Sequence, residues 1–298
     1  MIVHLVDGTY ELFRQHFGAA AARRGSDTPV SSVAATVGVL SSTLQLLADG
    51  ATHVGVASDH VIESFRNDLW ATYKTSAGMD PVLLQQIPLM EQSLVAMGVT
   101  CWAMVEYEAD DALGAAAVLA DADERVSQVV ICTPDKDLGQ VVKGTRIVQL
   151  DRRKGEVIDE AGVRAKFGVP PASIPDWLGL VGDAADGFPG IAGWGAKSAA
   201  AVLAAYGHLE AIPASTGKWD VPGLRGAAKL SVNLQANLAD AVLFRRLATL
   251  ETDIDVGTVD DWAWSGPTAD FTRVCHELGA SPLAERARKL ADRRRAAG

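Results

Sequence analysis

The sequence predicts an α/β protein with a mostly parallel central sheet flanked by helices, followed by a helical region. In the first 150 residues, apolar runs typical of strands alternate with segments of helical periodicity. Parallel strands need long crossover connections, usually helices, so this alternation favours a parallel sheet covered on both faces. Strand patterns are lost from about residue 159 onward. We therefore expect an α/β domain at residues 1–158 and a helical region at residues 159–298.

The expected elements are short and regularly spaced. Strands are predicted at residues 2–6, 53–58, 99–104, 129–132 and 147–150. Helices are predicted at about residues 31–48, 82–97, 110–120 and 138–142. Residues 19–28 combine small and charged side chains and are expected to form a loop. Glycine and proline interrupt the helical region near residues 187–195 and 213–226.

The composition is that of a soluble globular protein, with 48% hydrophobic and 21% charged residues in 298. No apolar run approaches the roughly 18 residues that span a bilayer, and the N-terminus turns acidic too early for a signal peptide. Cys101, Cys132 and Cys275 have no paired spacing and are expected to be reduced thiols. We expect a cytoplasmic protein with no membrane association.

Nine carboxylates follow the predicted strands or lie in one later loop. Ligands of open α/β sheets gather beyond the carboxyl ends of the strands. Each acid alone is more simply a helix cap or a solvated side chain, but clustered carboxylates repel one another unless cations neutralise them. The set consists of Asp7, Asp59, Glu108, Asp110, Asp111, Asp135, Asp137, Asp183 and Asp186. Asp183 and Asp186 would share a helical face if their turn is helical.

An all-oxygen ligand set of this kind suits Mg²⁺ or Mn²⁺ rather than zinc. Two such ions can activate water and stabilise the leaving oxygen of a phosphodiester. The net charge of −10 argues at first against nucleic acid. However, the chain without these nine acids would be almost neutral, and bound cations would offset part of their charge. Net charge therefore does not exclude a DNA substrate.

Two other phosphate chemistries are disfavoured by single residues. A phosphatase of the haloacid dehalogenase type needs an aspartate nucleophile two residues before Asp7, where this chain has Leu5. A P-loop needs Gly-Lys-Ser in succession, and here Ala196 follows Gly195 and precedes Lys197.

Residues 188–198 instead fit a hairpin between two helices. Glycines would allow close approach of the backbone, and the N–H groups at the start of the second helix would hold a DNA phosphate. The DNA-binding candidates here are Gly190, Gly193, Gly195, Lys197 and Ser198. A purely structural turn is the alternative.

Residues 63–74 supply cations and aromatic rings. On a continuous helix, Arg66 and Lys74 would lie on one face and could steady the phosphate under attack. Tyr73 or Trp70 could stack on an unpaired base. An ordinary amphipathic surface helix is the alternative. The basic stretch at residues 286–295 is either a frayed, solvated tail or a phosphate contact.

Taken in order, these segments resemble the bacterial and phage 5′ nuclease (flap endonuclease) family, over about residues 1–205. The motifs are Leu5-Val6-Asp7-Gly8, Phe65-Arg66, Tyr73-Lys74, Glu108-Ala109-Asp110-Asp111, Thr133-Pro134-Asp135-Lys136-Asp137-Leu138, and Gly182-Asp183 through Lys197. The resemblance is to a stand-alone form without a polymerase domain. It implies a PIN-like nuclease core with an arch or threading region at about residues 61–90. It also implies a helix-hairpin-helix element at about residues 181–206.

The resemblance further implies a metal-dependent cut near a junction of single strand and duplex, and 5′-3′ exonuclease activity at the same site. The nine acids would hold two or three Mg²⁺ or Mn²⁺ ions. Lys74 and Arg66 match the phosphate-contacting cations of the family. The hairpin would grip duplex backbone with a K⁺ on its carbonyls. The expected partners are DNA with 5′ flaps, nicks, gaps or free 5′ ends, bound by a monomer acting in DNA replication and repair.

Three positions depart from the family pattern. Ala77 stands where an arginine is usual, the arch across residues 75–88 is short and poor in cations, and Trp194 replaces a common isoleucine. We therefore expect intact chemistry with weaker capture of 5′ flaps. Two alternatives remain open at this stage: a related metal-dependent ribonuclease, and a non-catalytic protein that binds DNA junctions.

Overall fold

The computed structural model describes residues 1–22 and 32–297. It divides into two compact units, each described by itself below. Unit 1 comprises residues Met1–Ile62, Ser76–Thr133 and Thr252–Gly298, and unit 2 comprises Glu63–Thr75 and Pro134–Glu251. This division by packing does not follow the chain order, and the boundary expected at residue 158 stays a prediction. Within the described ranges, no helix is both long and apolar enough to cross a membrane.

Unit 1 is built on parallel strands in the order β3-β2-β1-β4. They are β1 (Ile2–Asp7), β2 (His53–Asp59), β3 (Thr100–Met104) and β4 (Gln128–Cys132). The register places Val3 opposite both His53 and Val129. Val3, Leu5 and Val6 are fully buried, as expected for a central parallel strand that is covered on both faces. The predicted strands of this sheet are confirmed to within one residue at each end.

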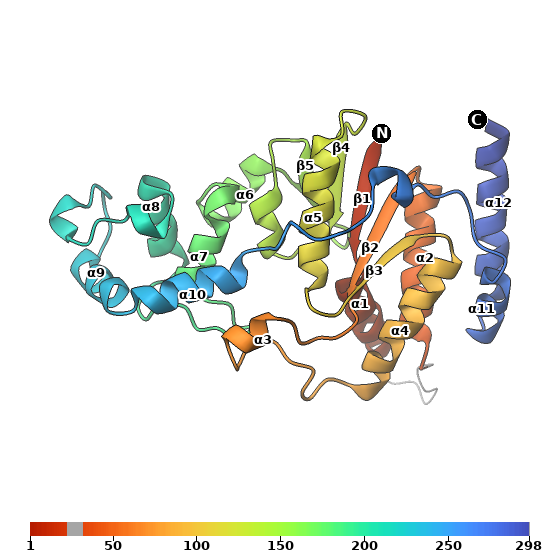
Figure 1. The fold of residues 1–298 in the computed structure, drawn as a ribbon, viewed down its shortest axis with the longest axis horizontal. Helices are drawn as coiled ribbons and strands as arrows, with labels where there is room; N and C mark the ends of the chain where they lie inside the picture. The colour runs from red at the N-terminus through yellow and green to blue at the C-terminus, as the bar shows by residue number, and fades with distance from the viewer. Residues whose placement is uncertain (23–31, 298) are drawn as a thin grey trace. The chain divides into compact units, whose positions relative to one another are not determined.

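Helices cover both faces of this sheet (Figure 1). Helix α5 (Ala109–Ala122) packs on one face, while α1 (Gly8–Ala22) and α4 (Pro81–Ala96) pack on the other. Helix α2 (Ala34–Ala48) packs on α1 and α4. Helix α1 was not expected, and it takes in the first four residues of the loop predicted at 19–28. Residues 23–28 of that loop lie outside the described residues.

The C-terminal segment completes unit 1 with η5 (Val259–Trp262), α11 (Phe271–Glu277) and α12 (Ser281–Ala297). Arg294 of α12 donates from Nη2 to the carbonyl oxygens of Leu47 and Ala51 and lies over the ring of Trp264, 5.1 Å from its centroid. The guanidinium thus adds a donor to carbonyls at and just beyond the end of α2; that of Leu47 also accepts from the Gly50 N–H at 3.1 Å. The basic tail is a docked helix, and the alternative of a frayed tail is wrong.

Unit 2 is mainly helical, which confirms the expectation for residues beyond 159. Its strands β5 (Ile147–Asp151) and β6 (Glu156–Ile158) pair antiparallel, and β6 was not predicted. The helix expected at 138–142 is the 3₁₀ helix η1 (Asp137–Val141). The remaining elements are α3 (Arg66–Leu69), α6 (Glu160–Phe167), η2 (Pro171–Ser173), α7 (Ile174–Val181), α8 (Ala196–Tyr206), η3 (Leu209–Ala211), η4 (Thr216–Lys218), α9 (Ala227–Ala236) and α10 (Leu238–Ala248).

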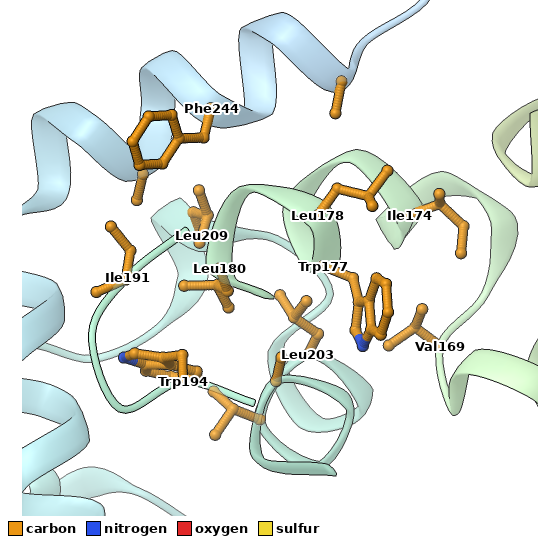
Figure 2. Close-up of a cluster of buried hydrophobic side chains, with 14 of the residues drawn as sticks. Val169, Ile174, Trp177, Leu178, Leu180, Ile191, Trp194, Leu203, Leu209 and Phe244 are labelled. Atoms are coloured by element: carbon orange, nitrogen blue, oxygen red, sulfur yellow. The ribbon is translucent and has the colours of Figure 1, made fainter. Parts of the chain in front are cut away.

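Helix α7 is the centre of the hydrophobic core of unit 2 (Figure 2). Trp177, Leu178 and Leu180 of α7 pack in one cluster with Leu203 of α8 and Phe244 of α10. Helices α7 and α10 approach closely at Gly179, where a Cβ atom would lie only 2.8 Å from the carbonyl oxygen of Ala241. The α/β fold with a separate helical region, as predicted, is confirmed.

Candidate metal centre and nucleic-acid interface

In unit 1, two acids stand at the carboxyl ends of adjacent strands. Asp7 ends β1, and its carboxylate accepts hydrogen bonds from the Tyr10 N–H at 2.8 Å and the Thr133 hydroxyl at 3.0 Å. Asp59 ends β2, and its Oδ1 accepts from the Ala109 N–H at 2.8 Å. Both side chains are buried. Neighbouring parallel strands therefore present these acids at one edge of the sheet, as predicted.

The first turn of α5 carries three further acids of unit 1. Glu108 and Asp111 are buried and Asp110 is partly exposed. Asp111 accepts from the Glu108 N–H at 2.9 Å, which caps the helix. The Asp59 carboxylate accepts a hydrogen bond from Ala109, which also lies in the first turn of α5. The start of α5 therefore lies against the end of β2. We call Asp7, Asp59, Glu108, Asp110 and Asp111 the strand-end cluster.

In unit 2, carboxylates from two separate segments meet. Asp137, Asp183 and Asp186 each offer an oxygen atom that lies within 4.8 Å of the others. Asp135 belongs to the same group, since its Oδ1 accepts from the Asp137 N–H at 3.0 Å. We call Asp135, Asp137, Asp183 and Asp186 the loop cluster.

Asp183 and Asp186 do not share a helical face, because their turn is not helical. These residues lie in a tight turn, in which Asp183 exchanges both backbone hydrogen bonds with Phe188, at 2.9 and 3.0 Å. Gly187 has a φ of 80°, and a Cβ atom there would lie 2.0 Å from the Thr72 carbonyl oxygen. A tight turn that requires glycine at position 187 therefore brings the carboxylates of Asp183 and Asp186 close to that of Asp137.

The carboxylates of the loop cluster repel one another. Burial, followed by the charges of Asp135 and Asp186, raises the pKa of Asp137 well above its usual value. Across the described residues, nothing donates a hydrogen bond to its buried Oδ1 atom. A buried carboxylate oxygen without a donor is costly. A divalent cation would supply the missing partner and neutralise the repulsion between the carboxylates. The carboxylate oxygens of the loop cluster therefore fit a metal with oxygen ligands.

Lys136 pairs with Asp183 and is a site residue that sequence reasoning left without a role. Burial alone would lower the pKa of Lys136. The hydrogen bond from Lys136 to Asp183 and the charges of Asp137, Asp183 and Asp135 outweigh burial and raise the pKa. Lys136 could have been predicted as a site residue from the sequence, because it lies between Asp135 and Asp137 in the same motif. Gln149 was also missed; it is buried, and its amide donates to the Asp135 carbonyl at 2.5 Å.

Lys74 lies beside the loop cluster. Its N–H donates to the Asp186 carbonyl at 3.0 Å, and the indole of Trp70 donates to the Gly187 carbonyl at 3.1 Å. Asn67, another residue that was missed, donates from Nδ2 to the carbonyl oxygens of Tyr73 and Lys74 at 3.3 and 3.2 Å. These contacts tie the segment that carries Lys74 to the turn that carries Asp186.

Arg66 and Tyr73 do not have the surroundings that were expected. Helix α3 ends at Leu69, so Arg66 and Lys74 do not share a continuous helix. Arg66 is 2% exposed, and its guanidinium donates to the carbonyl oxygens of Leu247 and Thr249 at 2.7 and 3.0 Å. Tyr73 is 3% exposed in the core of unit 2. Burial therefore favours packing roles for both, and their DNA contacts stay predictions.

The segment between α7 and α8 forms a hairpin, as predicted. Gly190 and Gly193 have φ values of 68° and 85°. A Cβ atom on Gly190 would lie 2.4 Å from the Gly182 nitrogen, so this glycine is required by the packing of the hairpin itself. The Ser198 hydroxyl accepts from the Gly195 N–H at 3.0 Å at the start of α8, and Lys197 is exposed beside it.

Trp194 anchors the hairpin to α9. It is buried, and its indole donates to the Leu230 carbonyl at 3.1 Å. Asn233 of α9 donates to the Ala192 carbonyl at 2.6 Å. A groove beside the hairpin is lined by Lys197 and also by Arg225, a cation that sequence reasoning missed because it lies far along the chain in a Gly/Pro-rich loop.

Two family models together match residues 2–270 of the chain. The 5′-3′ exonuclease N-terminal resolvase-like domain matches residues 2–168, and the 5′-3′ exonuclease C-terminal SAM fold matches residues 169–270. The chain belongs to the 5′-3′ exonuclease family. The predicted family is thus confirmed.

The chain is similar both to a 5′-3′ exonuclease of comparable length and to a much longer DNA polymerase I. The chain is 31% identical to a 5′-3′ exonuclease of Buchnera aphidicola over 85% of this chain and 82% of the relative. It is 33% identical to DNA polymerase I of Pseudomonas aeruginosa, over 88% of this chain but 28% of that protein. The chain spans 24–34% of the length of the polymerase relatives that it matches.

Solved structures of similar fold have low identity to this 5′-3′ exonuclease homologue. The phage T5 D15 protein co-crystallised with metal ions has a TM-score of 0.66 at 15% identity, covering 98% of this chain and 99% of that one. Flap endonuclease-1 from Methanococcus jannaschii has a TM-score of 0.61 at 14% identity, covering 98% and 93%. At such identities the likeness supports the fold.

Proposed function

We propose that this protein is a metal-dependent 5′ nuclease that acts on DNA as a 5′-flap endonuclease and a 5′-3′ exonuclease. The observation that carries the proposal is the buried, donor-free carboxylate oxygen of Asp137 within the loop cluster. In a chain of the 5′-3′ exonuclease family, this arrangement is best accounted for by a bound divalent cation. The DNA-bound form of the T5 D15 flap endonuclease, which shares the fold, adds support for the substrate.

The strand-end cluster and the loop cluster would hold Mg²⁺ or Mn²⁺, two or three ions in all. Such ions, when bound, lower the pKa of a ligated water and stabilise the leaving oxygen. Lys136 forms an ion pair with the Asp183 carboxylate, so a cation held by Asp183 would compete with Lys136 for that carboxylate or share it. Lys74, tied to the Asp186 turn, is the residue we assign to the scissile phosphate.

Arg66 has a second task in this proposal. It fixes the carbonyl oxygens of Leu247 and Thr249, and therefore holds the end of α10 to the segment that leads to Lys74. We retain its phosphate contact as a prediction. Protein partners are not part of the proposal, and we propose a cytoplasmic monomer. The three cysteines are free thiols, which fits a reducing compartment.

The hairpin is the proposed grip on duplex backbone. Lys197 and the N–H groups at the start of α8 would meet a phosphate, and Arg225 lines the same groove. We further propose K⁺ on the hairpin carbonyls; that of Ala192 already accepts from Asn233, so the others would carry the ion.

Replacing Lys197 with alanine is expected to weaken binding of duplex DNA while leaving the cleavage rate at saturating DNA nearly unchanged. Removing one phosphate contact also lowers the steepness with which binding falls with salt. Fluorescence anisotropy with a labelled duplex in Ca²⁺ would measure this. Exchange of K⁺ for Li⁺ at equal ionic strength tests the cation. Equal affinity in both salts would remove K⁺ from the proposal, and an unchanged salt dependence in the variant would remove Lys197.

The direct test of the proposed function is cleavage of end-labelled DNA in Mg²⁺ or Mn²⁺. We expect products with 5′-phosphate and 3′-hydroxyl ends from a 5′-flap duplex and from a duplex with a free 5′ end, and none in EDTA. The ratio of the cleavage rate on the flap substrate to that on the simple 5′ end tests the weaker flap capture expected around Ala77. A lower ratio than that of a relative with a richly basic arch would support this expectation. A matched RNA substrate tests the ribonuclease alternative. Tight junction binding without product at any metal concentration would replace the proposal with that of a non-catalytic binder.

A further inference from the structure

Glu91 is a buried carboxylate of α4 that contacts the residues on both sides of Asp59. Its Oε1 accepts from the Ser58 hydroxyl at 2.6 Å, and its Oε2 lies 2.7 Å from Nδ1 of His60. Successive side chains of a strand point to opposite faces of the sheet. Asp59 accordingly meets the first turn of α5 on one face, while Ser58 is bonded to α4 on the other. One side chain thus holds the end of β2 around Asp59.

Glu91 keeps its carboxylate in buried surroundings. Glu91 is 7% exposed and Ser58 is fully buried. Burial, followed by the charge of Glu91, raises the pKa of the neighbouring Cys101 thiol to about 12. An apolar side chain at position 91 would pack against the sheet at lower electrostatic cost. The two acceptor atoms of a carboxylate, however, fix Ser58 and His60 together, which an apolar residue cannot do.

A second contact restrains the backbone at the same place. The Asp59 N–H donates to the Thr9 hydroxyl at 2.8 Å, and the His60 N–H donates to the Ser58 carbonyl at 3.1 Å. The backbone of Asp59 is therefore held by Thr9, its carboxylate by Ala109, and its two neighbours by Glu91. Only the last of these restraints comes from a side chain that is itself ionisable and belongs to neither acid cluster.

We propose that Glu91, through Ser58 and His60, is a positioning residue that sets the direction of the Asp59 carboxylate for metal binding. The inference rests on the proposed function, because it takes Asp59 to be a metal ligand. Groups that orient metal ligands typically change metal affinity by about 10- to 100-fold when they are removed. Glu91 itself touches neither substrate nor metal.

The test measures Mn²⁺ binding to the full chain by titration calorimetry, without DNA. An Asp59→Asn variant first identifies the binding step that depends on Asp59. Glu91→Ala is expected to weaken that step by about 10-fold or more. Glu91→Gln is expected to restore most of the affinity, because its amide oxygen can still accept from Ser58 and its NH₂ can hydrogen-bond to Nδ1 of His60 when the ring proton is on Nε2. Gln86→Ala is the matched control.

Gln86 lies on the same helix, is also buried, and accepts from the N–H groups of Ala35 and Thr36 at 3.1 Å. Its loss should lower thermal stability without changing Mn²⁺ affinity. In cleavage assays, Glu91→Ala should raise the Mn²⁺ concentration for half-maximal rate while the rate at saturating Mn²⁺ stays within a few-fold of wild type.

Unchanged Mn²⁺ affinity in Glu91→Ala would overturn the inference, as would an equal loss in Gln86→Ala, which would indicate general loosening of α4. If Glu91→Ala does not fold, the double substitution Ser58→Ala with His60→Ala removes the same contacts and must give the same loss of affinity. Wild-type protein that binds no Mn²⁺ would overturn the proposed function together with this inference. Normal wild-type binding with normal Glu91→Ala binding would overturn the inference alone.

Discussion

Replacing Asp137 with asparagine is expected to lower the rate of DNA cleavage by at least about 100-fold and, in EDTA, to make the protein more stable. The rate falls because a metal ligand matters at least as much as the groups that orient one, whose loss costs 10- to 100-fold. Stability rises because burial, followed by the charges of Asp135 and Asp186, disfavours the ionised form of Asp137, which asparagine lacks. We expect a gain of about 1 kcal/mol in the free energy of unfolding. Single-turnover cleavage and urea unfolding measure the two effects.

The matched control is Asp151→Asn, which alters another buried aspartate of unit 2. Asp151 accepts from the N–H groups of Arg153 and Lys154 at 3.0 and 3.2 Å. Burial acts to raise the pKa of Asp151, but these bonds outweigh burial and lower it. Asp151 therefore contributes stability at pH values above the usual aspartate pKa, which is lost as the pH falls. This variant should lose stability and keep its cleavage rate. The same pattern in Asp137→Asn would contradict a metal-binding role.

Replacing Asp176 with alanine is expected to lower the free energy of unfolding by about 3 kcal/mol or more. Asp176 lies buried on α7 and accepts from Arg245 at 3.0 Å, from the Leu209 N–H at 3.1 Å, and contacts Nδ1 of His208 at 2.8 Å. Its removal leaves the buried Leu209 N–H without an acceptor and removes the ion pair with Arg245 that joins α7 to α10. Urea unfolding monitored by tryptophan fluorescence would measure the loss.

Glu210→Ala is the control for this network, because Glu210 pairs with the same Arg245 at 2.6 Å but is mostly exposed. Its loss should cost less than about 1 kcal/mol. The hydrogen bond from Arg245 lowers the pKa of Glu210 to about 2. Its small contribution is therefore present above the usual glutamate pKa and is lost as the pH falls toward 2. Equal losses in both variants would indicate that burial of Asp176 does not matter.

Periodicity predicted the parts of the fold in which side-chain pattern and backbone geometry agree. Strand β1 is apolar at nearly every position because it is buried on both faces, so it could be read directly. Helix α1 was missed because it begins at Gly8, immediately after β1, where glycine and Thr9 suggest a turn. Strand β6 has three residues, and only its last one is buried, so it carries no apolar pattern.

The acids were found because each follows a strand or lies in a motif. Their surroundings could not be predicted, since these depend on contacts between distant residues. Arg66 illustrates this: its cation suggested a phosphate, but its partners are carbonyls some 180 positions away. Glu91 has no motif at all, and only the packing of α4 against β2 reveals its relation to Asp59.

The interleaved course of the chain has a consequence for the order in which the protein can be completed during synthesis. Unit 1 draws on residues Thr252–Gly298, so the ribosome must finish the whole of unit 2 before the last piece of unit 1 emerges. Until Arg294 is made, the carbonyls of Leu47 and Ala51 lack the hydrogen bonds from its guanidinium. Helix α2 also lacks the contacts that α12 makes with it in the folded protein. A nascent chain in that state exposes apolar surface for longer than one whose domains follow each other in sequence.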